Sequence, residues 1–262
     1  MKFSKIILGA LALCISAAAF GQTADEIAKK VHDLPDGKTN YMVARLTLLD
    51  KAGKSRIREI AAYKLEEGTT KKSVTIFRSP KDVAGVSYLS FDYPDNPDGS
   101  AKDSDSWLYL PAMKKARRVS GSSKDDDFQG TDFTYDDIGE RSLGKDTFKI
   151  LGSENVGGKD CWILECTAKN ANSKITRRVM WIDKSNYTTL KGEYYDKQGK
   201  KFKELLCEDI SQIDGFWTTK KMTMTNISTS HKTVYELLEV KYNIKIDANI
   251  FTVSALEREL VK

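Results

Sequence analysis

The chain is 262 residues long, carries a formal net charge of +5, and is 40% hydrophobic and 30% charged by residue count. That length fits one β-rich domain with a sizeable core. A charge this close to balance argues against nucleic acid as a partner and against strong attraction to anionic lipid.

The first 21 residues have the pattern of a cleaved secretory signal peptide. Lys2 and Lys5 give a positive start, residues 6–15 form an apolar stretch, and small residues at positions 19 and 21 precede Gln22. We therefore expect cleavage before Gln22, a periplasmic location and a single mature domain over residues 22–262. Loss of the two lysines lowers the formal charge to +3. No later run reaches the roughly twenty apolar residues of a membrane span, so we expect a soluble mature chain.

The cysteines do not form the pattern of a disulfide framework. Cys14 opens the alternative of a lipoprotein, but a bulky leucine stands before it where a small residue would be expected. Three cysteines remain after cleavage, an odd number. Cys161 and Cys166 are five apart on one predicted strand, so they point to opposite faces. A bond from Cys166 to Cys207 would have to cross intervening strands; that pairing stays open, and buried thiols are favoured.

The mature chain begins with a predicted helix. Thr23 can cap it, with Glu26 reaching back three residues later, and an apolar stripe runs over residues 27–31 before the breaker Pro35–Gly37. A helix this short should lie against the rest of the protein. A packed cap and a moving lid both fit this pattern.

Most of the remaining chain is predicted to be strand. In residues 41–49, Met42, Leu46 and Leu48 share one face and Arg45 the other, which is the alternation of a half-buried strand. Further strand-like runs cover residues 56–65, 72–78 and 83–91, and residues 160–246 form a meander of β-rich runs with short turns. A sheet this wide must curl around something or present an apolar face to something.

Residues 94–144 interrupt the meander. A loop at 94–99 and a strand at 107–111 lead to a basic run, and then to a polar stretch at 120–130 that is too long for a tight hairpin. Residues 133–138 could begin a short helix or an edge strand. We expect residues 113–138 to form a mobile flap that is too polar to pack.

The basic run has three possible roles. It could dock an acidic patch on a membrane transporter, contact anionic headgroups, or form a solvated turn. The neighbouring aspartates 125–127 could neutralise it, and three adjacent aspartates are poorly spaced for calcium. The predicted partner-docking residues are Lys114, Lys115, Arg117 and Arg118.

These segments carry a resemblance to a known family. The runs 107–119 and 130–138, followed in order by 181–184, 195–200, 213–217, 224–226 and 249–252, resemble the outer-membrane lipoprotein-sorting proteins, a LolA-like group of exported bacterial carriers. The resemblance implies a mainly β fold with an open, strongly curved antiparallel sheet. This unclosed β-barrel has a few helices covering its concave apolar face. It also implies a cavity for acyl chains and transfer of lipid or lipoprotein between membranes.

The family also supplies expectations about partners and a lid. Relatives are associated with inner-membrane lipid exporters, so such an exporter and transient membrane contact are the implied partners. Well-studied chaperones of this fold latch the lid with a buried arginine. Arg45 and Arg58 are the candidates here, and both could equally be solvent-facing sheet residues.

The residues expected to line the cavity are inward-facing and mostly flexible, as suits a wall that repacks around variable chains. From alternation alone an ordinary packed core is the competing interpretation. The predicted lining consists of Met42, Leu46, Leu48, Leu89, Leu108, Leu110, Met113, Met180, Ile182, Met222 and Met224.

An enzyme is the less favoured class. His32 and His231 are the two histidines, and neither lies in a zinc or nucleophile motif. Asp136, Asp137 and Glu140 could pair for glycoside chemistry, but no motif supports this. We therefore expect no catalysis, metal or cofactor. The alternative function is a periplasmic accessory subunit of a lipid exporter that carries no lipid, and a hydrolase is a remote alternative.

Overall fold

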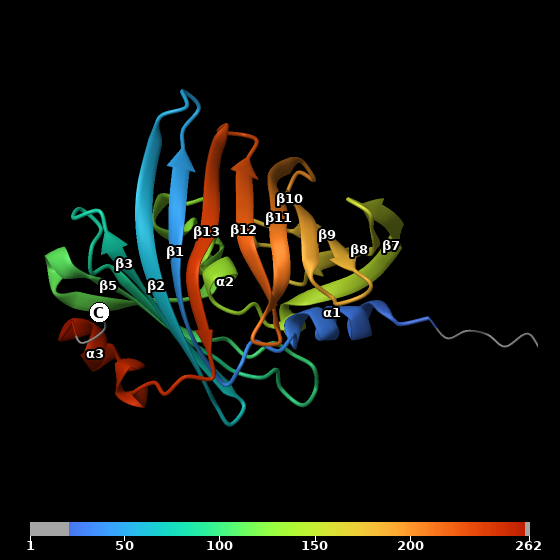
Figure 1. Ribbon diagram of the computed structural model, residues 1–262. Helices are drawn as coiled ribbons and strands as arrows, with labels where there is room; N and C mark the ends of the chain where they lie inside the picture. Colours follow the sequence, from blue (N-terminus) through green and yellow to red (C-terminus); the bar gives the residue numbers. More distant parts are fainter. Residues whose placement is uncertain (1–20, 260–262) are drawn as a thin grey trace, which may run out of the picture.

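One antiparallel sheet of thirteen strands forms the body of the protein (Figure 1). The computed structural model describes residues 21–259. All of the predicted signal peptide except Gly21 lies outside the described residues and stays a prediction. Within residues 21–259, no helix is long and apolar enough to cross a membrane.

The strands divide into two runs that meet in the middle of the sheet. The order across the sheet is β6-β5-β4-β3-β2-β1-β13-β12-β11-β10-β9-β8-β7. The strands are β1 (Thr39–Leu49), β2 (Ser55–Glu67), β3 (Thr70–Ser79), β4 (Ser87–Asp92), β5 (Asp105–Leu110), β6 (Lys115–Val119), β7 (Asp146–Val156), β8 (Lys159–Ala168), β9 (Arg177–Asp183), β10 (Thr189–Tyr195), β11 (Lys201–Ile213), β12 (Phe216–Asn226) and β13 (His231–Tyr242).

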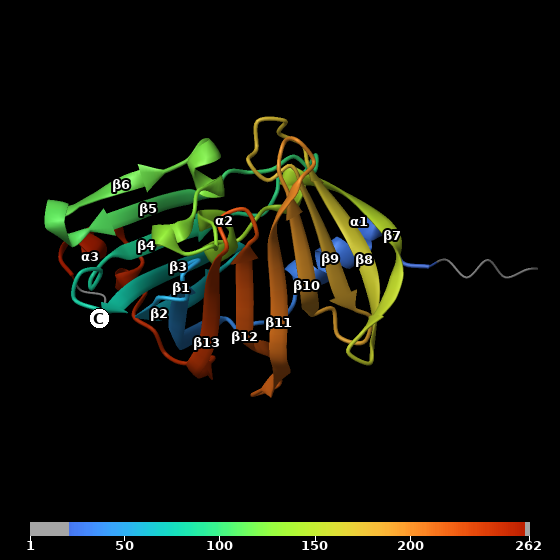
Figure 2. The same cartoon turned by 90° about the horizontal axis from the view of Figure 1, so that it is seen from above.

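Viewed from above, the sheet curves around helix α2 (Tyr135–Ile138) without closing (Figure 2). The end strands β6 and β7 pair with β5 and β8 respectively, not with each other. The predicted open, strongly curved antiparallel sheet is confirmed.

Helix α1 (Ala24–His32) covers the concave face at the β7–β9 end. The predicted cap is confirmed: Glu26 donates its backbone N–H to the Thr23 hydroxyl at 3.2 Å, and the Glu26 carboxylate accepts from the Thr23 N–H at 2.8 Å. Ile27 is fully buried against Leu164 and Ile182. Packing of this apolar stripe holds a helix that is too short to be stable alone.

The interrupting segment packs more tightly than its composition predicts. The basic run forms the edge strand β6, after the 3-10 turn η1 (Pro111–Met113). Behind it the turns η2 (Gly121–Asp125) and η3 (Phe128–Gly130) lead to α2. Phe128 is fully buried, and its ring lies 5.5 Å from that of Phe77 and 5.3 Å from that of Tyr135. The expectation that this stretch is too polar to pack is therefore wrong, and its mobility stays a prediction.

The C-terminal segment covers the opposite, convex face of β2–β5. The turn η5 (Ala248–Ile250) and helix α3 (Val253–Glu257) place Phe251 and Leu256 against Val74 and Leu89. Strands β3 and β4 are thus buried on both faces, which is why their sequences lack clean alternation.

Candidate ligand cavity

A cavity of about 700 Å³ lies on the concave face, between the end of α1, α2 and the central strands. Its apolar walls come from β1, β2, β11, β12 and β13 and from the α2 segment. The apolar lining includes Met42, Leu46, Ile60, Phe133, Ile138, Leu205, Met222, Met224, Leu237 and Val240. A volume of this size is typical of sites for small organic ligands.

Strand register brings four of the predicted lining residues together. Leu46 lies opposite Tyr235 on β13, which in turn lies opposite Met222 on β12, so the three form one row across the sheet. Met42 contacts the same row, because the Tyr235 hydroxyl donates to the Met42 sulfur at 3.4 Å. Met224 is the fourth predicted residue among the lining residues.

Three other predicted residues share the concave face but lie in packed core. Leu48, Leu108 and Leu110 belong to the cluster around Phe128. Leu108 is fully buried there. The ring of Phe128, supplied by the interrupting segment, fills the space that the sequence pattern left open.

The remaining four predicted residues lie elsewhere. Met180 and Ile182 pack beneath α1. Leu89 faces the convex side against α3, because β4 is apolar on both faces and its alternation does not identify the cavity side. Met113, in the turn after β5, is 66% exposed. None of these four lines the cavity.

A charged bridge at the cavity rim was missed by sequence reasoning. The His32 Nε2 atom lies 2.9 Å from the Glu140 carboxylate, which also accepts from the Lys71 ammonium. Burial would raise the pKa of Glu140, but the hydrogen bonds from His32 and Lys71 outweigh it and lower that pKa. The hydrogen bond to Glu140 raises the pKa of His32 above its usual 6.5, against burial. Three separate elements supply these residues, so no sequence spacing could reveal them.

A second ionic network fastens the α2 segment to the β7–β9 end. Arg141 donates to both carboxylate oxygens of Asp146, at 2.8 and 2.7 Å, and to Asp136 at 2.7 Å. Arg178 on β9 lies 3.5 Å from Asp146 and stacks over Tyr194. Burial alone would lower the pKa of Arg141, but its hydrogen bonds to Asp146 raise it. Bidentate pairs of this kind fix orientation as well as adding energy.

The candidate catalytic carboxylates have separate structural partners. Asp136 belongs to the Arg141 network, Asp137 accepts from the Thr134 backbone and hydroxyl at the start of α2, and Glu140 lies in the rim bridge. His231 bonds Asp132 at 2.7 Å. Over residues 21–259, no group of three His, Cys, Asp or Glu residues is placed to hold a metal ion.

The three cysteines described are free. Cys161 and Cys166 pack in different clusters on opposite faces of β8, as the spacing predicts. Cys166 and Cys207 lie on β8 and β11, and strands β9 and β10 separate them in the sheet.

The predicted docking residues lie together at the sheet edge. Lys114, Lys115, Arg117 and Arg118 are all exposed, and Arg118 forms an ion pair with Asp105. The aspartates 125–127 do not neutralise this run. Asp126 pairs with Lys174 and Asp127 with Lys203.

Of the two candidate latch arginines, one contacts the interrupting segment. Arg58 donates to the backbone oxygen of Gln129 in η3, and its guanidinium lies 5.6 Å from the centre of the Phe77 ring. Arg45 is exposed on the convex side of β1.

Comparisons with known proteins agree with this architecture. A family model described only as an uncharacterised protein matches residues 69–258. No curated protein matches the sequence. A LolA superfamily protein from Nitrosomonas europaea has the same fold, with a TM-score of 0.68 at 18% identity over 88% of this chain and 98% of the other. The chain therefore has the same open-sheet fold as this protein.

Two solved structures are more similar. A DUF1329 family protein from Desulfovibrio piger is 30% identical over 89% of this chain and 97% of its own, with a TM-score of 0.81. A domain from Vibrio parahaemolyticus named for outer membrane lipoprotein sorting is 30% identical over 90% and 98%, with the same TM-score. The chain belongs to this family of outer-membrane lipoprotein-sorting proteins, and the resemblance seen in the sequence is confirmed.

Proposed function

We propose that the protein is a periplasmic carrier that holds the acyl chains of a lipid or lipoprotein in the concave cavity and transfers them between membranes. The observation that carries the proposal is the cavity of about 700 Å³, which has mostly apolar walls and lies on the face that the sheet curves around. The signal-peptide pattern and the family support a periplasmic location.

The chemistry of the walls suits acyl chains. Each buried methylene gains about 0.8 kcal/mol on leaving water, so a chain of ordinary length would be held without specific polar contacts. Met42 and Met222 are half-buried, unbranched and flexible, which allows the walls to fit chains of different length. The nearby carboxylates are engaged in structural ion pairs, so we favour a carrier over a hydrolase.

Filling the cavity tests the proposal directly. Met222→Trp adds bulk to a lining residue without burying a charge, and Met113→Trp makes the same change at an exposed residue. Wild type and Met113→Trp should bind pyrene-labelled phosphatidylethanolamine from vesicles, and Met222→Trp should bind it at least about tenfold more weakly. Native mass spectrometry should also show lipid co-purifying with wild type. No lipid and no probe binding with wild type would favour the non-carrying accessory subunit.

We also propose that the basic edge docks the transfer partner. Lys114, Lys115, Arg117 and Arg118 are exposed on or beside β6, a strand whose outer edge has no neighbouring strand in the described sheet. An edge of this kind can accept an acidic partner surface, and its charges would act mainly on association. An inner-membrane lipid exporter is the partner that the family resemblance implies.

A further inference from the structure

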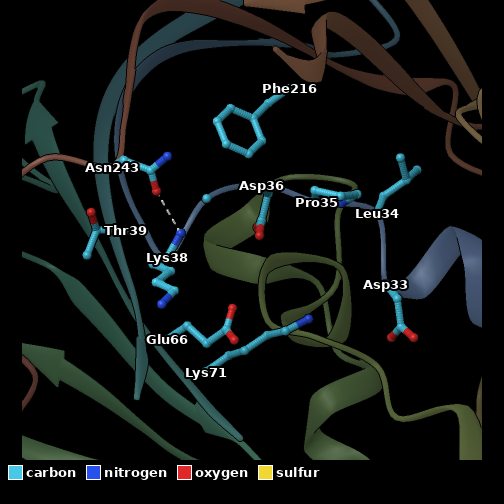
Figure 3. A pocket seen from close by; sticks show the side chains of 11 residues that line it. Asp33, Leu34, Pro35, Asp36, Lys38, Thr39, Glu66, Lys71, Phe216 and Asn243 are labelled. Atoms are coloured by element: carbon cyan, nitrogen blue, oxygen red, sulfur yellow. Dashed lines mark hydrogen bonds between the residues drawn. The ribbon is translucent and has the colours of Figure 1, made fainter. Parts of the chain in front are cut away.

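Three hollows meet at the rim of the cavity and share their walls. An outer pocket of about 840 Å³ lies beyond the linker between α1 and β1 (Figure 3). It shares Leu34, Asp36 and Lys71 with the inner cavity. A smaller pocket of about 160 Å³ shares His32, Lys71 and Glu140 with the inner cavity. Of the rim bridge, His32 and Glu140 line the inner cavity and the smaller pocket, and Lys71 lines all three hollows. The bridge therefore separates the inner cavity from the smaller pocket, and its Lys71 also borders the outer pocket.

The bridge joins three elements through their side chains. His32 is the last residue of α1, Lys71 lies on β3, and Glu140 follows α2. Glu140 accepts from both cations with one carboxylate oxygen. Its carboxylate thus holds the end of α1 and the α2 segment against the sheet.

The walls on either side of the bridge are fixed independently. Arg141, the next residue in the chain, is held by Asp146 through two hydrogen bonds. The linker is held to the sheet by the Lys64–Asp36 ion pair and by the Lys38 N–H, which donates to the Asn243 side chain at 3.0 Å (Figure 3). The Glu140 side chain can therefore swing aside while the backbone around it stays in place.

We propose that the Lys71–Glu140–His32 bridge is a gate between the inner cavity and the two pockets at its rim, and that acyl chains enter and leave when Glu140 releases its two partners. This inference rests on the proposed carrier function and names the route that the cargo takes. The outer pocket then receives the polar part of the cargo. Its lining suits that role because it mixes Pro35 and Phe216 with Lys38 and Glu66.

The charged groups that face His32 should make the gate open more easily as the pH rises. Asp33 on its own helix end, Glu140 from the α2 segment and Lys71 from β3 surround the imidazole. Below its usual pKa of 6.5 the imidazolium is present and the bridge is complete; as the pH rises through its raised pKa, that contribution is lost. Burial raises the pKa of the neighbouring Asp92 to about 6. Asp92 therefore becomes negatively charged beside Glu140 as the pH rises, which also weakens the bridge. The gate is therefore tighter in acid and looser above neutral pH.

Release kinetics of a loaded probe test the gate. Protein loaded with pyrene-labelled phosphatidylethanolamine is mixed with vesicles of unlabelled phosphatidylethanolamine and phosphatidylglycerol. Glu140→Gln removes the charge and keeps the shape, and it should release the probe about tenfold faster than wild type. Glu165→Gln is the matched control, because Glu165 pairs with Arg177, its side chain is 19% exposed against 24% for Glu140, and it lies on the convex face. The control should release the probe at the wild-type rate.

A second variant distinguishes opening of the gate from a general destabilisation of the fold. His32→Gln keeps a hydrogen-bond donor but cannot titrate, so its release should already be fast at about pH 5.5. Up to about pH 8.5 its release should change with pH much less than that of wild type, because only Asp92 still titrates beside Glu140. If Glu140→Gln does not fold, as judged by circular dichroism, His32→Gln alone decides. Equal release rates and equal pH profiles for wild type and the folded variants, with loading intact, would overturn the gate and leave the carrier. Failure of wild type to load at all would remove the carrier itself.

Discussion

The β3–β5 end of the sheet and its centre share one continuous concave face but differ in what lies on it. At the β3–β5 end, Phe128 fills the concave side and α3 covers the convex side, so Leu108 is fully buried. In the centre, the concave side lines the cavity, and the convex side exposes large apolar residues such as Leu206 and Leu238, 45% and 47% accessible. One sheet thus contains a solid core and a hollow wall.

The comparison teaches that strand alternation identifies a buried face without saying what it is buried against. Leu46 and Leu108 are both almost inaccessible, at 2% and 0%. Both pack in the cluster around Phe128, but Leu46 also borders the cavity, whereas Leu108 does not. The difference comes from the interrupting segment, which is far away in the sequence. Phe128 from this segment fills the space over Leu108, whereas Phe133 and Ile138 leave a hollow against the central strands.

The largest expected effect is a difference in the free energy of unfolding between variants at these two leucines. Leu108→Ala leaves a new hole in packed core and should lower the free energy of unfolding by about 4 kcal/mol. Leu46→Ala only widens an existing hollow and should cost about 2 kcal/mol, because fewer contacts are lost. Urea denaturation of both variants measures the difference. Equal costs at the two sites would mean that the cavity wall is as tightly packed as the core.

The two ionic anchors of the α2 segment should respond to pH in opposite directions. Burial would raise the pKa of Asp136, but Lys145 and Arg141 outweigh it and lower that pKa. A lowered carboxylate pKa contributes stability that is present above the usual value of 3.8 and is lost as the pH falls through the lowered value. The Arg141 network is therefore weakened by acid, whereas the His32 bridge is weakened by base.

Removing one partner of this network tests that anchor. Asp136→Asn leaves Arg141 and Lys145 short of a buried carboxylate and should cost about 3 kcal/mol at neutral pH. The cost should shrink toward zero in acid, where wild type has lost the same charge. Unfolding free energies measured between about pH 3 and about pH 7 check this sign. A cost that stays constant over that range would show that the Asp136 charge has no part in holding α2.

Much of the architecture could be predicted from local pattern. The alternation over Met42, Leu46 and Leu48 placed all three on the concave face, and the Thr23 and Glu26 pattern predicted the cap of α1. These features depend on residues close together in the chain and on the repeat of about 2.0 residues in a strand or about 3.6 in a helix, so they can be read from the sequence. Leu89 was assigned to the wrong face because β4 is apolar on both sides.

The rim of the site could not be predicted. His32 is separated from Glu140 by more than a hundred residues, and each looks like an ordinary surface residue in its own context. Phe128 lies in a run of serines, aspartates and glycines that reads as a solvated loop, yet its single ring organises the packed end of the sheet. Long-range pairing of this kind is a property of the closed fold and leaves no spacing signal.

The smallest effect should appear at the edge of the sheet, where β6 carries charge and no cargo. Changing Lys114, Lys115, Arg117 and Arg118 together to glutamate should alter the free energy of unfolding by less than about 0.5 kcal/mol, because all four are exposed. The rate of lipid transfer to vesicles that contain the partner transporter should fall about tenfold at low salt and much less at high salt, because these charges steer association. A matched control reverses the exposed Lys51, Lys54, Lys197 and Lys200, which lie in turns at or between strands. If both fourfold variants slow transfer equally, net charge alone explains the effect and the basic edge is not a docking surface.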